Sequence, residues 1–171
     1  ALCGCLRFMV RQFYQVMLLL LTLCAAALVQ AKVEVRPVMH KTVGLILVVN
    51  VSEDIAPGDY ELLLKGLRAN PGKFSRKIVW LNNIGGSVPE ALKMGRLLRE
   101  TGFDTMVPST GVCQGSCVYL LAAGQNKTVR GYVGIHRPYY PHGDSALAGM
   151  GYNGQRYNTA GYWREMDIPS S

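Results

Sequence analysis

The sequence predicts an α/β fold with a largely parallel sheet, and two observations support this. Apolar, β-branched runs of strand length alternate along the chain with segments of helical periodicity. The connections between them are short, which favours right-handed βα crossovers within one sheet. The first run, 42–49 (TVGLILVV), is continuous and apolar, as expected for a strand covered on both faces.

A helix and a second strand follow this first run. A turn at 56–59 (APGD) opens the helix, and 70–72 (NPG) ends it. Three leucines at helical spacing mark its buried face: Leu63, Leu64 and Leu67. The second strand is expected at 78–81 (IVWL).

A glycine loop, 82–87 (NNIGGS), leads from the second strand directly into another helix. Ser87 and Glu90 have the spacing of a capping box at the start of this helix. Gly102 ends the helix. Its apolar positions fall on one face: Val88, Ala91, Leu92, Gly95 and Leu98.

The second half of the chain continues the alternation. A short third strand is expected at 105–107, and a buried helix at 117–123 (CVYLLAA) ends at Gly124. A further strand, 129–135, leads to His136. Beyond Pro141 the composition shifts to Gly, Tyr, Asn and Ser, which predicts a loop, and a last helix is expected from near Asn158 to Ser171.

Residues 1–31 have the three parts of a secretory signal peptide: a basic start, a short apolar core and a small-residue cleavage site. Met9 is the expected start, with 1–8 as upstream flank. The apolar run, 16–29, is shorter than the ~20 residues that a spanning helix needs. We therefore expect cleavage after Ala31 and export to the periplasm of a bacterium or outside the cell. An uncleaved anchor is the alternative, and would be the chain's contact with the membrane.

Residues 32–171 suit a single domain with a substantial core. Of the 18 lysines and arginines, two lie in the leader, which leaves 16 against 11 acidic residues. The densest basic group lies between Lys65 and Lys77, and aromatic interleaving of the kind that single-strand binders use is absent there. A solvated basic face accounts for it, so we expect no nucleic-acid partner.

Two cysteines, Cys113 and Cys117, remain after cleavage. In an exported protein so close a pair favours a disulfide, with a reduced, buried pair as the alternative. Two sulfurs without a third and fourth ligand nearby make a poor zinc site, so we expect no metal.

Three elements in order along the chain suggest one site. Gly85 and Gly86 lie between a strand end and a helix start, where backbone N–H groups can approach a substrate closely. Ser116 lies at another strand-to-helix junction, and His136 lies at a strand end. Each has an ordinary explanation when taken alone: a tight turn, a helix cap and a solvent-facing histidine. Their order matters more than the individual residues: an oxyanion loop, then a nucleophile turn, then a base.

This order and its surroundings resemble the Clp protease proteolytic subunit and the wider Clp/crotonase superfamily, especially its small exported branch. Segment 78–88 (IVWLNNIGGSV) resembles the family's strand and glycine loop, 120–124 (LLAAG) its nucleophile-bearing helix, and 134–138 (GIHRP) the strand that carries its base. The similarity spans 57–140. It implies a Clp/crotonase-like fold and an exported serine hydrolase, a peptidase acting on peptides or proteins without a cofactor. It also implies a homo-oligomer, because relatives assemble into rings or trimers.

The same resemblance assigns roles to the site residues. Ser116 would attack the substrate carbonyl, and His136 would take the proton. Backbone N–H groups of Gly85 or Gly86, together with that of Cys117, would bind the oxyanion.

The register of the nucleophile turn leaves a second interpretation open. Aligned without gaps through LLAAG, the family's serine falls on Gly115, one residue before Ser116, and one residue on a helix rotates a side chain by about 100°. The alternative is therefore a catalytically inactive binding or assembly module with Gly115 in the nucleophile seat. A third interpretation, an acyl-CoA enzyme, needs a cytoplasmic cofactor, and the signal peptide argues against it.

The third member of a catalytic triad should follow His136. The acids in that direction are Asp144, Glu165 and Asp167, and none lies in a matching motif. We therefore expect the chain to stop before the family's closing helix.

Overall fold

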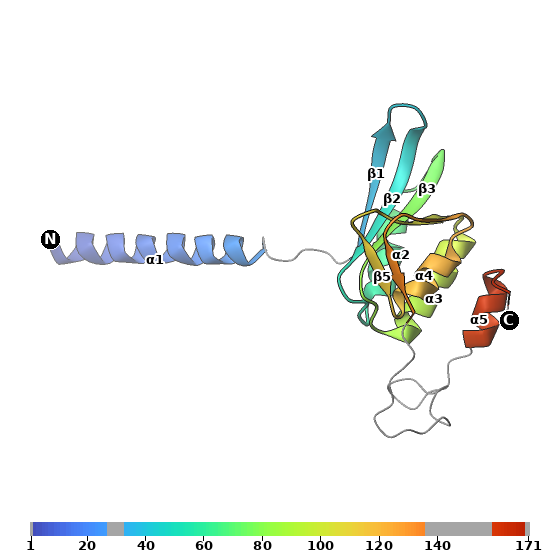
Figure 1. Ribbon diagram of the computed structural model, residues 1–171. Helices are drawn as coiled ribbons and strands as arrows, with labels where there is room; N and C mark the ends of the chain where they lie inside the picture. Colours follow the sequence, from blue (N-terminus) through green and yellow to red (C-terminus); the bar gives the residue numbers. More distant parts are fainter. Residues whose placement is uncertain (1, 27–32, 136–158, 170–171) are drawn as a thin grey trace, which may run out of the picture. The chain divides into compact units, whose positions relative to one another are not determined.

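The computed structural model describes residues 2–26, 33–135 and 159–169 (Figure 1). The chain divides into two compact units, residues 1–31 and 32–171, which are described separately. The loop expected beyond Pro141 lies outside the described residues.

The N-terminal unit contains one helix, α1 (Leu2–Ala26). Its segment Leu2–Thr22 is long and apolar enough to cross a membrane, and it is the one such helix in the described part of the chain. A signal sequence near an N-terminus has the same properties. The helix also takes in residues 2–8, which we expected to be flank. The apolar side chains of residues 2–22 are exposed, so this unit is compatible with a signal sequence or a membrane span.

The second unit is an α/β fold with a largely parallel sheet, as the sequence predicts. The five-stranded sheet has the order β1-β2-β3-β4-β6, in which the β1–β2 pair is antiparallel and the other pairs are parallel. A second, two-stranded parallel sheet is formed by β5 and β7. The elements are β1 (Val33–His40), β2 (Gly44–Ser52), α2 (Asp59–Ala69), β3 (Arg76–Asn82), α3 (Val88–Glu100), β4 (Asp104–Val107), β5 (Val112–Gln114), α4 (Cys117–Ala123), β6 (Lys127–Val129), β7 (Tyr132–Gly134) and α5 (Thr159–Glu165).

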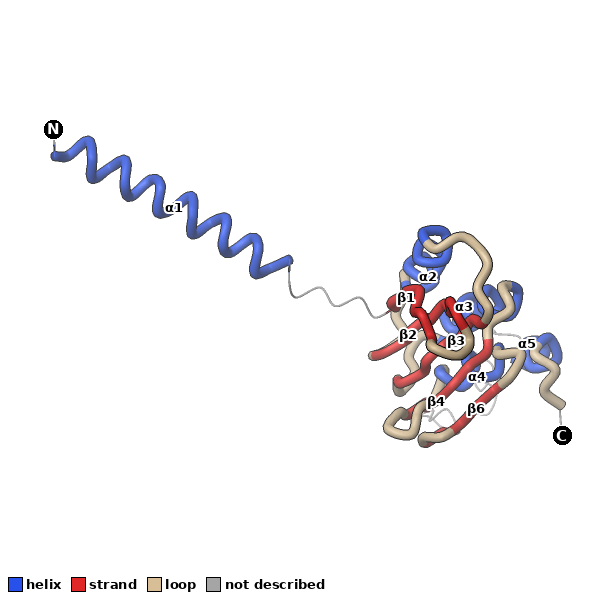
Figure 2. The backbone as a smooth tube through the Cα atoms, turned by 90° about the horizontal axis from the view of Figure 1, so that it is seen from above, coloured by secondary structure: helices blue, strands red, loops and turns tan. Residues whose placement is uncertain are grey.

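The sheet is covered on one face. In β2 the side chains of Leu47, Val49 and Val51 are buried, whereas the residues between them are partly exposed. Helices α2, α3 and α4 lie on the buried side (Figure 2). The expectation that the first strand is covered on both faces was therefore wrong, because β2 pairs with the unpredicted β1 in a hairpin whose outer face is open.

The predicted strand 129–135 is in fact two short strands in different sheets. β6 extends the large sheet beside β4, and β7 pairs with β5. Gly131 lies between them, where a Cβ would come within 2.3 Å of the carbonyl oxygens of both Pro108 and Gly111. A glycine is needed for the chain to pass this close to another backbone segment.

The core lies between the large sheet and the helices. Burial of each such side chain contributes roughly 1.5–3 kcal/mol, so this layer sets the position of the loops at its edge. The most completely buried core side chains include Val49, Leu63, Val79, Leu81, Met94, Leu98, Phe103, Val107 and Leu120.

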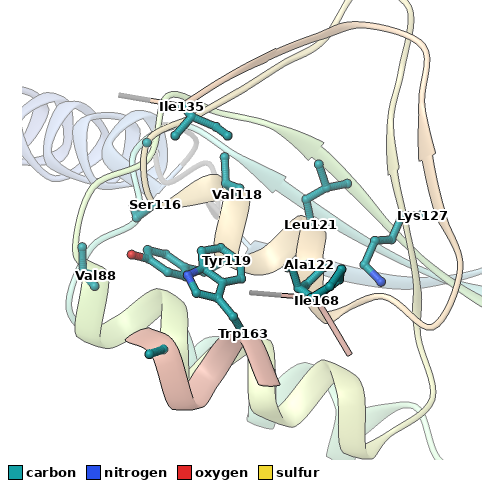
Figure 3. A pocket seen from close by; sticks show the side chains of 13 residues that line it. Val88, Ser116, Val118, Tyr119, Leu121, Ala122, Lys127, Ile135, Trp163 and Ile168 are labelled. Atoms are coloured by element: carbon teal, nitrogen blue, oxygen red, sulfur yellow. The ribbon is translucent and has the colours of Figure 1, made fainter. Parts of the chain in front are cut away.

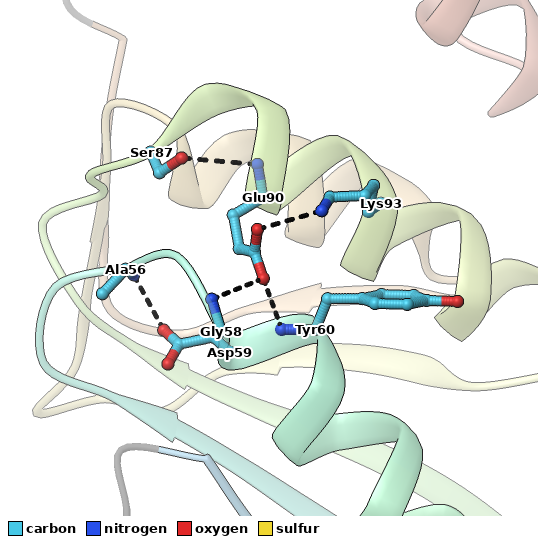
Figure 4. A network of polar contacts seen from close by, with 7 residues as sticks. All are labelled: Ala56, Gly58, Asp59, Tyr60, Ser87, Glu90 and Lys93. Atoms are coloured by element: carbon cyan, nitrogen blue, oxygen red, sulfur yellow. Dashed lines mark hydrogen bonds and ion pairs between the residues drawn. The ribbon is translucent and has the colours of Figure 1, made fainter.

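Glu90 joins helix α3 to the start of α2 (Figure 4). One half of the predicted capping box forms, because Ser87 Oγ accepts a hydrogen bond from the Glu90 N–H. The Glu90 carboxylate does not return to Ser87. Its Oε1 accepts the N–H groups of Gly58 and Tyr60, at 3.1 and 2.7 Å, and its Oε2 pairs with Lys93. The buried carboxylate thus caps α2, which has no side-chain cap of its own.

Helix α5 packs on α3 and α4. Tyr162 is fully buried, and its hydroxyl donates to the Tyr119 carbonyl. Burial raises the pKa of Tyr162 above its ordinary range. Gly95 makes room for this ring, because a Cβ there would overlap the tyrosine oxygen. The last helix is therefore present as expected, although it is shorter than predicted.

Candidate functional site

The site lies where four chain segments run side by side. Isolated bridges pair Ile55 with Gly86 and Asn83 with Cys113, and the β5–β7 register pairs Gln114 with Gly134. The glycine loop, the turn after β5 and the end of β7 are thereby brought to one place. Of the three elements that the sequence analysis put in order, the glycine loop and the Ser116 turn are thus spatial neighbours, and the position of His136 lies outside the described residues.

The glycine loop has no room for side chains at Gly85 and Gly86. Gly85 and Gly86 have φ angles of 94° and 143°. A Cβ on Gly86 would come within 2.2 Å of the Ile55 carbonyl oxygen, and one on Gly85 within 2.7 Å of the Ser116 nitrogen. The loop backbone therefore packs directly against the Ser116 turn.

Two asparagines hold the loop, and the sequence analysis gave them no role. The Asn83 side chain is buried, donates to the Val51 carbonyl and accepts the Gly85 N–H at 3.0 Å. Asn82 Oδ1 accepts the Val112 N–H, which ties the loop to β5. The signal for this role was the pair of asparagines directly after a predicted strand, where amide side chains commonly bond to nearby backbone groups.

The turn between β5 and α4 begins with Gly115 in the left-handed region, at φ 57°. A Cβ at this position would lie 3.2 Å from the Ile84 carbonyl oxygen, a close contact without overlap. Ser116 follows as the first residue of the α4 turn, and its side chain makes no capping hydrogen bond. Gly115 is therefore the residue of this strand-to-helix turn that has the left-handed conformation.

The hydroxyl of Ser116 is buried and unpaired. The residue is 5% exposed, and its Oγ has no hydrogen-bond partner among the described residues. Oγ lies 3.0 Å from the point where a Cβ on Gly85 would stand. Leaving a buried hydroxyl without a partner costs about 1–3 kcal/mol, which makes this atom the most unusual polar group of the described domain.

The backbone donors near this hydroxyl differ in their availability. The Gly85 N–H is already used by Asn83. Within the described part of the chain, the N–H groups of Gly86 and Cys117 make no hydrogen bond. Of the two glycines considered as oxyanion donors, Gly86 is therefore the one with a free N–H.

The predicted disulfide forms between Cys113 and Cys117, with a Cα–Cα distance of 5.3 Å. Both cysteines are fully buried. The bond joins the middle residue of β5 to the first residue of α4 and encloses the turn. It thereby restricts the directions in which Gly115 and Ser116 can point.

His136 and Asp144 lie outside the described residues. His136 follows β7 by two positions, and the last residue of that strand, Gly134, is the partner of Gln114 in the sheet. Glu165 and Asp167 are described and form ion pairs with Arg96 and Arg99 of α3. These two carboxylates are engaged in holding α5.

A pocket of about 770 Å³ opens beside the turn (Figure 3). Gly115 and Ser116 lie at one end, and Lys127 lines it as well. The rings of Tyr119 and Trp163 stack within it, with centroids 4.9 Å apart. Most of its lining is apolar. Val118, Tyr119, Leu121 and Ala122 belong to α4, Trp163 to α5 and Val88 to α3.

No constellation for a metal ion is present in the residues that the structure describes, where no three His, Cys, Asp or Glu side chains come together suitably. The chemistry available at the described site comes from a hydroxyl, two free N–H groups and an apolar pocket.

For this chain, matches among known proteins come from solved structures alone. No family model matches it, and no curated protein matches it. Among solved structures, it is similar to the ClpP protease catalytic domain from Plasmodium falciparum, at 18% sequence identity and a TM-score of 0.43. The similarity covers 54% of this chain and 55% of that chain.

Proposed function

We propose that this protein is an exported, Clp-protease-like serine hydrolase, a peptidase whose nucleophile is Ser116. One observation carries the proposal: a fully buried serine hydroxyl without a described partner lies against a glycine loop, at the end of an apolar pocket. An unpaired buried hydroxyl is a cost that packing alone does not explain. Reactivity explains it.

The proposed reaction uses the Ser116 hydroxyl, the N–H groups beside it and His136. Ser116 Oγ attacks a substrate carbonyl and gives its proton to His136, which the resemblance assigns as the base. The N–H groups of Gly86 and Cys117 donate to the oxyanion that develops. The scissile C–N bond then breaks, and the leaving amine takes the proton from His136, which gives the acyl-enzyme. Water attacks the acyl carbonyl with His136 as the base again, and the acid product leaves with Ser116 Oγ reprotonated. Glu165 and Asp167 are ion-paired with Arg96 and Arg99, so the proposal assigns neither of them to a triad.

Two features support export. The apolar helix α1 has the length and composition of a signal sequence or membrane span. The disulfide between Cys113 and Cys117 is of a kind that persists in oxidising compartments. We therefore assign the domain to the periplasm or the cell exterior, in the setting of a bacterium.

The test is turnover of activated acyl esters and short fluorogenic peptides by the full chain. Ser116→Ala should lower kcat/KM by at least about 10³-fold, as expected for loss of a serine nucleophile. Ser109→Ala is the matched control, because Ser109 is an exposed serine on the loop before β5. Equal activity in wild type and Ser116→Ala would contradict the proposal.

The second candidate is a binding module that has lost its nucleophile. Gly115 favours it, because this glycine holds the left-handed seat to which the ungapped alignment assigns the serine. Gly115→Ser puts a hydroxyl into that seat, where its Cβ would lie close to the Ile84 carbonyl without overlap. Activity that appears only in Gly115→Ser, with none in the wild type, would establish the binding module.

A further inference from the structure

The pocket beside Ser116 has an apolar body and one charged end. Of the described residues that line it, Lys127 alone carries a charge. Lys127 is the first residue of β6, beyond the end of α4, whereas Gly115 and Ser116 precede that helix. From Ser116 to Ala122 the wall follows α4 for about 9 Å, at 1.5 Å per residue.

The charged end is short of negative groups. Lys127 Nζ and Arg99 Nη1 both donate to the Gly124 carbonyl, at 2.8 and 3.1 Å. Asp167 pairs with Arg99, and no described carboxylate forms an ion pair with Lys127. Partial burial and the Arg99 charge lower the pKa of Lys127, and the Asp167 carboxylate offsets part of this shift. An added carboxylate would relieve the repulsion between the two cations.

The body of the pocket suits a single apolar chain. Leu121 and Ala122 of α4 face it from one side, and the stacked rings of Tyr119 and Trp163 form a broad apolar surface (Figure 3). Its volume of about 770 Å³ lies within the range usual for small-molecule sites, roughly 300–1,000 Å³.

We propose that the pocket binds a free medium-chain fatty carboxylate, with the carboxylate at Lys127 and the alkyl chain running along α4 toward Ser116. The charge complementarity at Lys127 and the apolar wall carry this assignment. It concerns the same pocket as the proposed hydrolase, but it requires no reactivity of Ser116.

The experiment follows Trp163 fluorescence in the full chain with Trp80→Phe, which removes the other tryptophan, an exposed residue of β3. Decanoate, decanol and decylamine are titrated at constant ionic strength. Decanoate should give a saturable blue shift. Lys127→Gln should weaken decanoate binding roughly threefold to tenfold, the loss of one partly exposed charged contact, and leave decanol unchanged. Lys73→Gln, at an exposed lysine on the loop after α2, is the matched control and should have no effect.

Three results would overturn the proposal: no response of Trp163, equal affinity for the acid and the amine, or decanoate binding that Lys127→Gln leaves unchanged. The titration measures binding and not turnover, so failure of the fatty-acid proposal can be distinguished from failure of the proposed hydrolase function. Decanoate binding in a chain without esterase or peptidase activity would refute the hydrolase alone.

Discussion

Replacing Ser116 by alanine should stabilise the domain, although it removes the proposed nucleophile. The Oγ atom is buried and has no described hydrogen-bond partner, so the folded state bears a desolvation cost of about 1–3 kcal/mol that alanine does not have. We expect the free energy of unfolding to rise by about 1 kcal/mol, since the small void left by the oxygen offsets part of the gain.

The matched control is Thr105→Val, at another buried hydroxyl that does have a partner. Thr105 is 1% exposed, and its Oγ1 donates to the Leu121 carbonyl at 2.7 Å. Its replacement removes a hydrogen bond and leaves an acceptor less satisfied, which should lower the free energy of unfolding by about 1–2 kcal/mol. The two substitutions therefore have opposite signs.

Urea unfolding of the full chain and both variants, followed by circular dichroism, measures these differences, provided that the m-values agree. The reasoning would be refuted if Ser116→Ala lowered the stability as much as Thr105→Val does. Such a result would mean that the Ser116 hydroxyl makes a stabilising hydrogen bond in the resting protein.

Three other substitutions test how the site is held. Gly86→Ala should lower the free energy of unfolding by about 4 kcal/mol, because the added Cβ overlaps the Ile55 carbonyl. Gly58→Ala is the control, also at positive φ but in open space, and should lower it by only about 1 kcal/mol. Equal losses of stability in thermal unfolding would contradict this reasoning. Glu90→Gln should lower the free energy of unfolding by about 2 kcal/mol and fray the start of α2, which amide hydrogen exchange measures. Unchanged exchange at the start of α2 would argue against the capping role of Glu90. Replacing both cysteines of the disulfide by alanine should lower the stability by about 2 kcal/mol and reduce ester turnover more than substrate binding, whereas unchanged kcat would show that the bond does not fix the turn.

The fold was largely predictable because its signals are local. The apolar run of β2, the helix signals of α3 and the match of α4 to 117–123 depend on neighbouring residues alone. The strand β1 was missed although its first four residues alternate between apolar and charged side chains, because Pro37 follows them; antiparallel pairing with β2 makes the whole segment a strand. The split between β6 and β7 depends on the close passage of Gly131 past a distant loop, which no local pattern records.

The candidate site was predictable in its parts and less so in its details. The glycine loop, the turn and the disulfide do lie together, as the order along the chain suggested. Asn83 decides which of the two glycines keeps a free N–H, because its side-chain oxygen accepts the N–H of Gly85. The burial of Ser116 depends on three-dimensional packing against the loop, so the sequence could not predict it.

The central claim is that Ser116 is a reactive nucleophile, and covalent labelling tests it most directly. The full chain, with its disulfide intact, is treated with a fluorophosphonate probe and then analysed by intact-mass and peptide mass spectrometry. The account predicts one adduct, located on Ser116 and absent from Ser116→Ala, with Ser109→Ala labelled as in the wild type. An intact, folded chain without an adduct on Ser116 would contradict it and leave a binding module with Gly115 in the nucleophile seat.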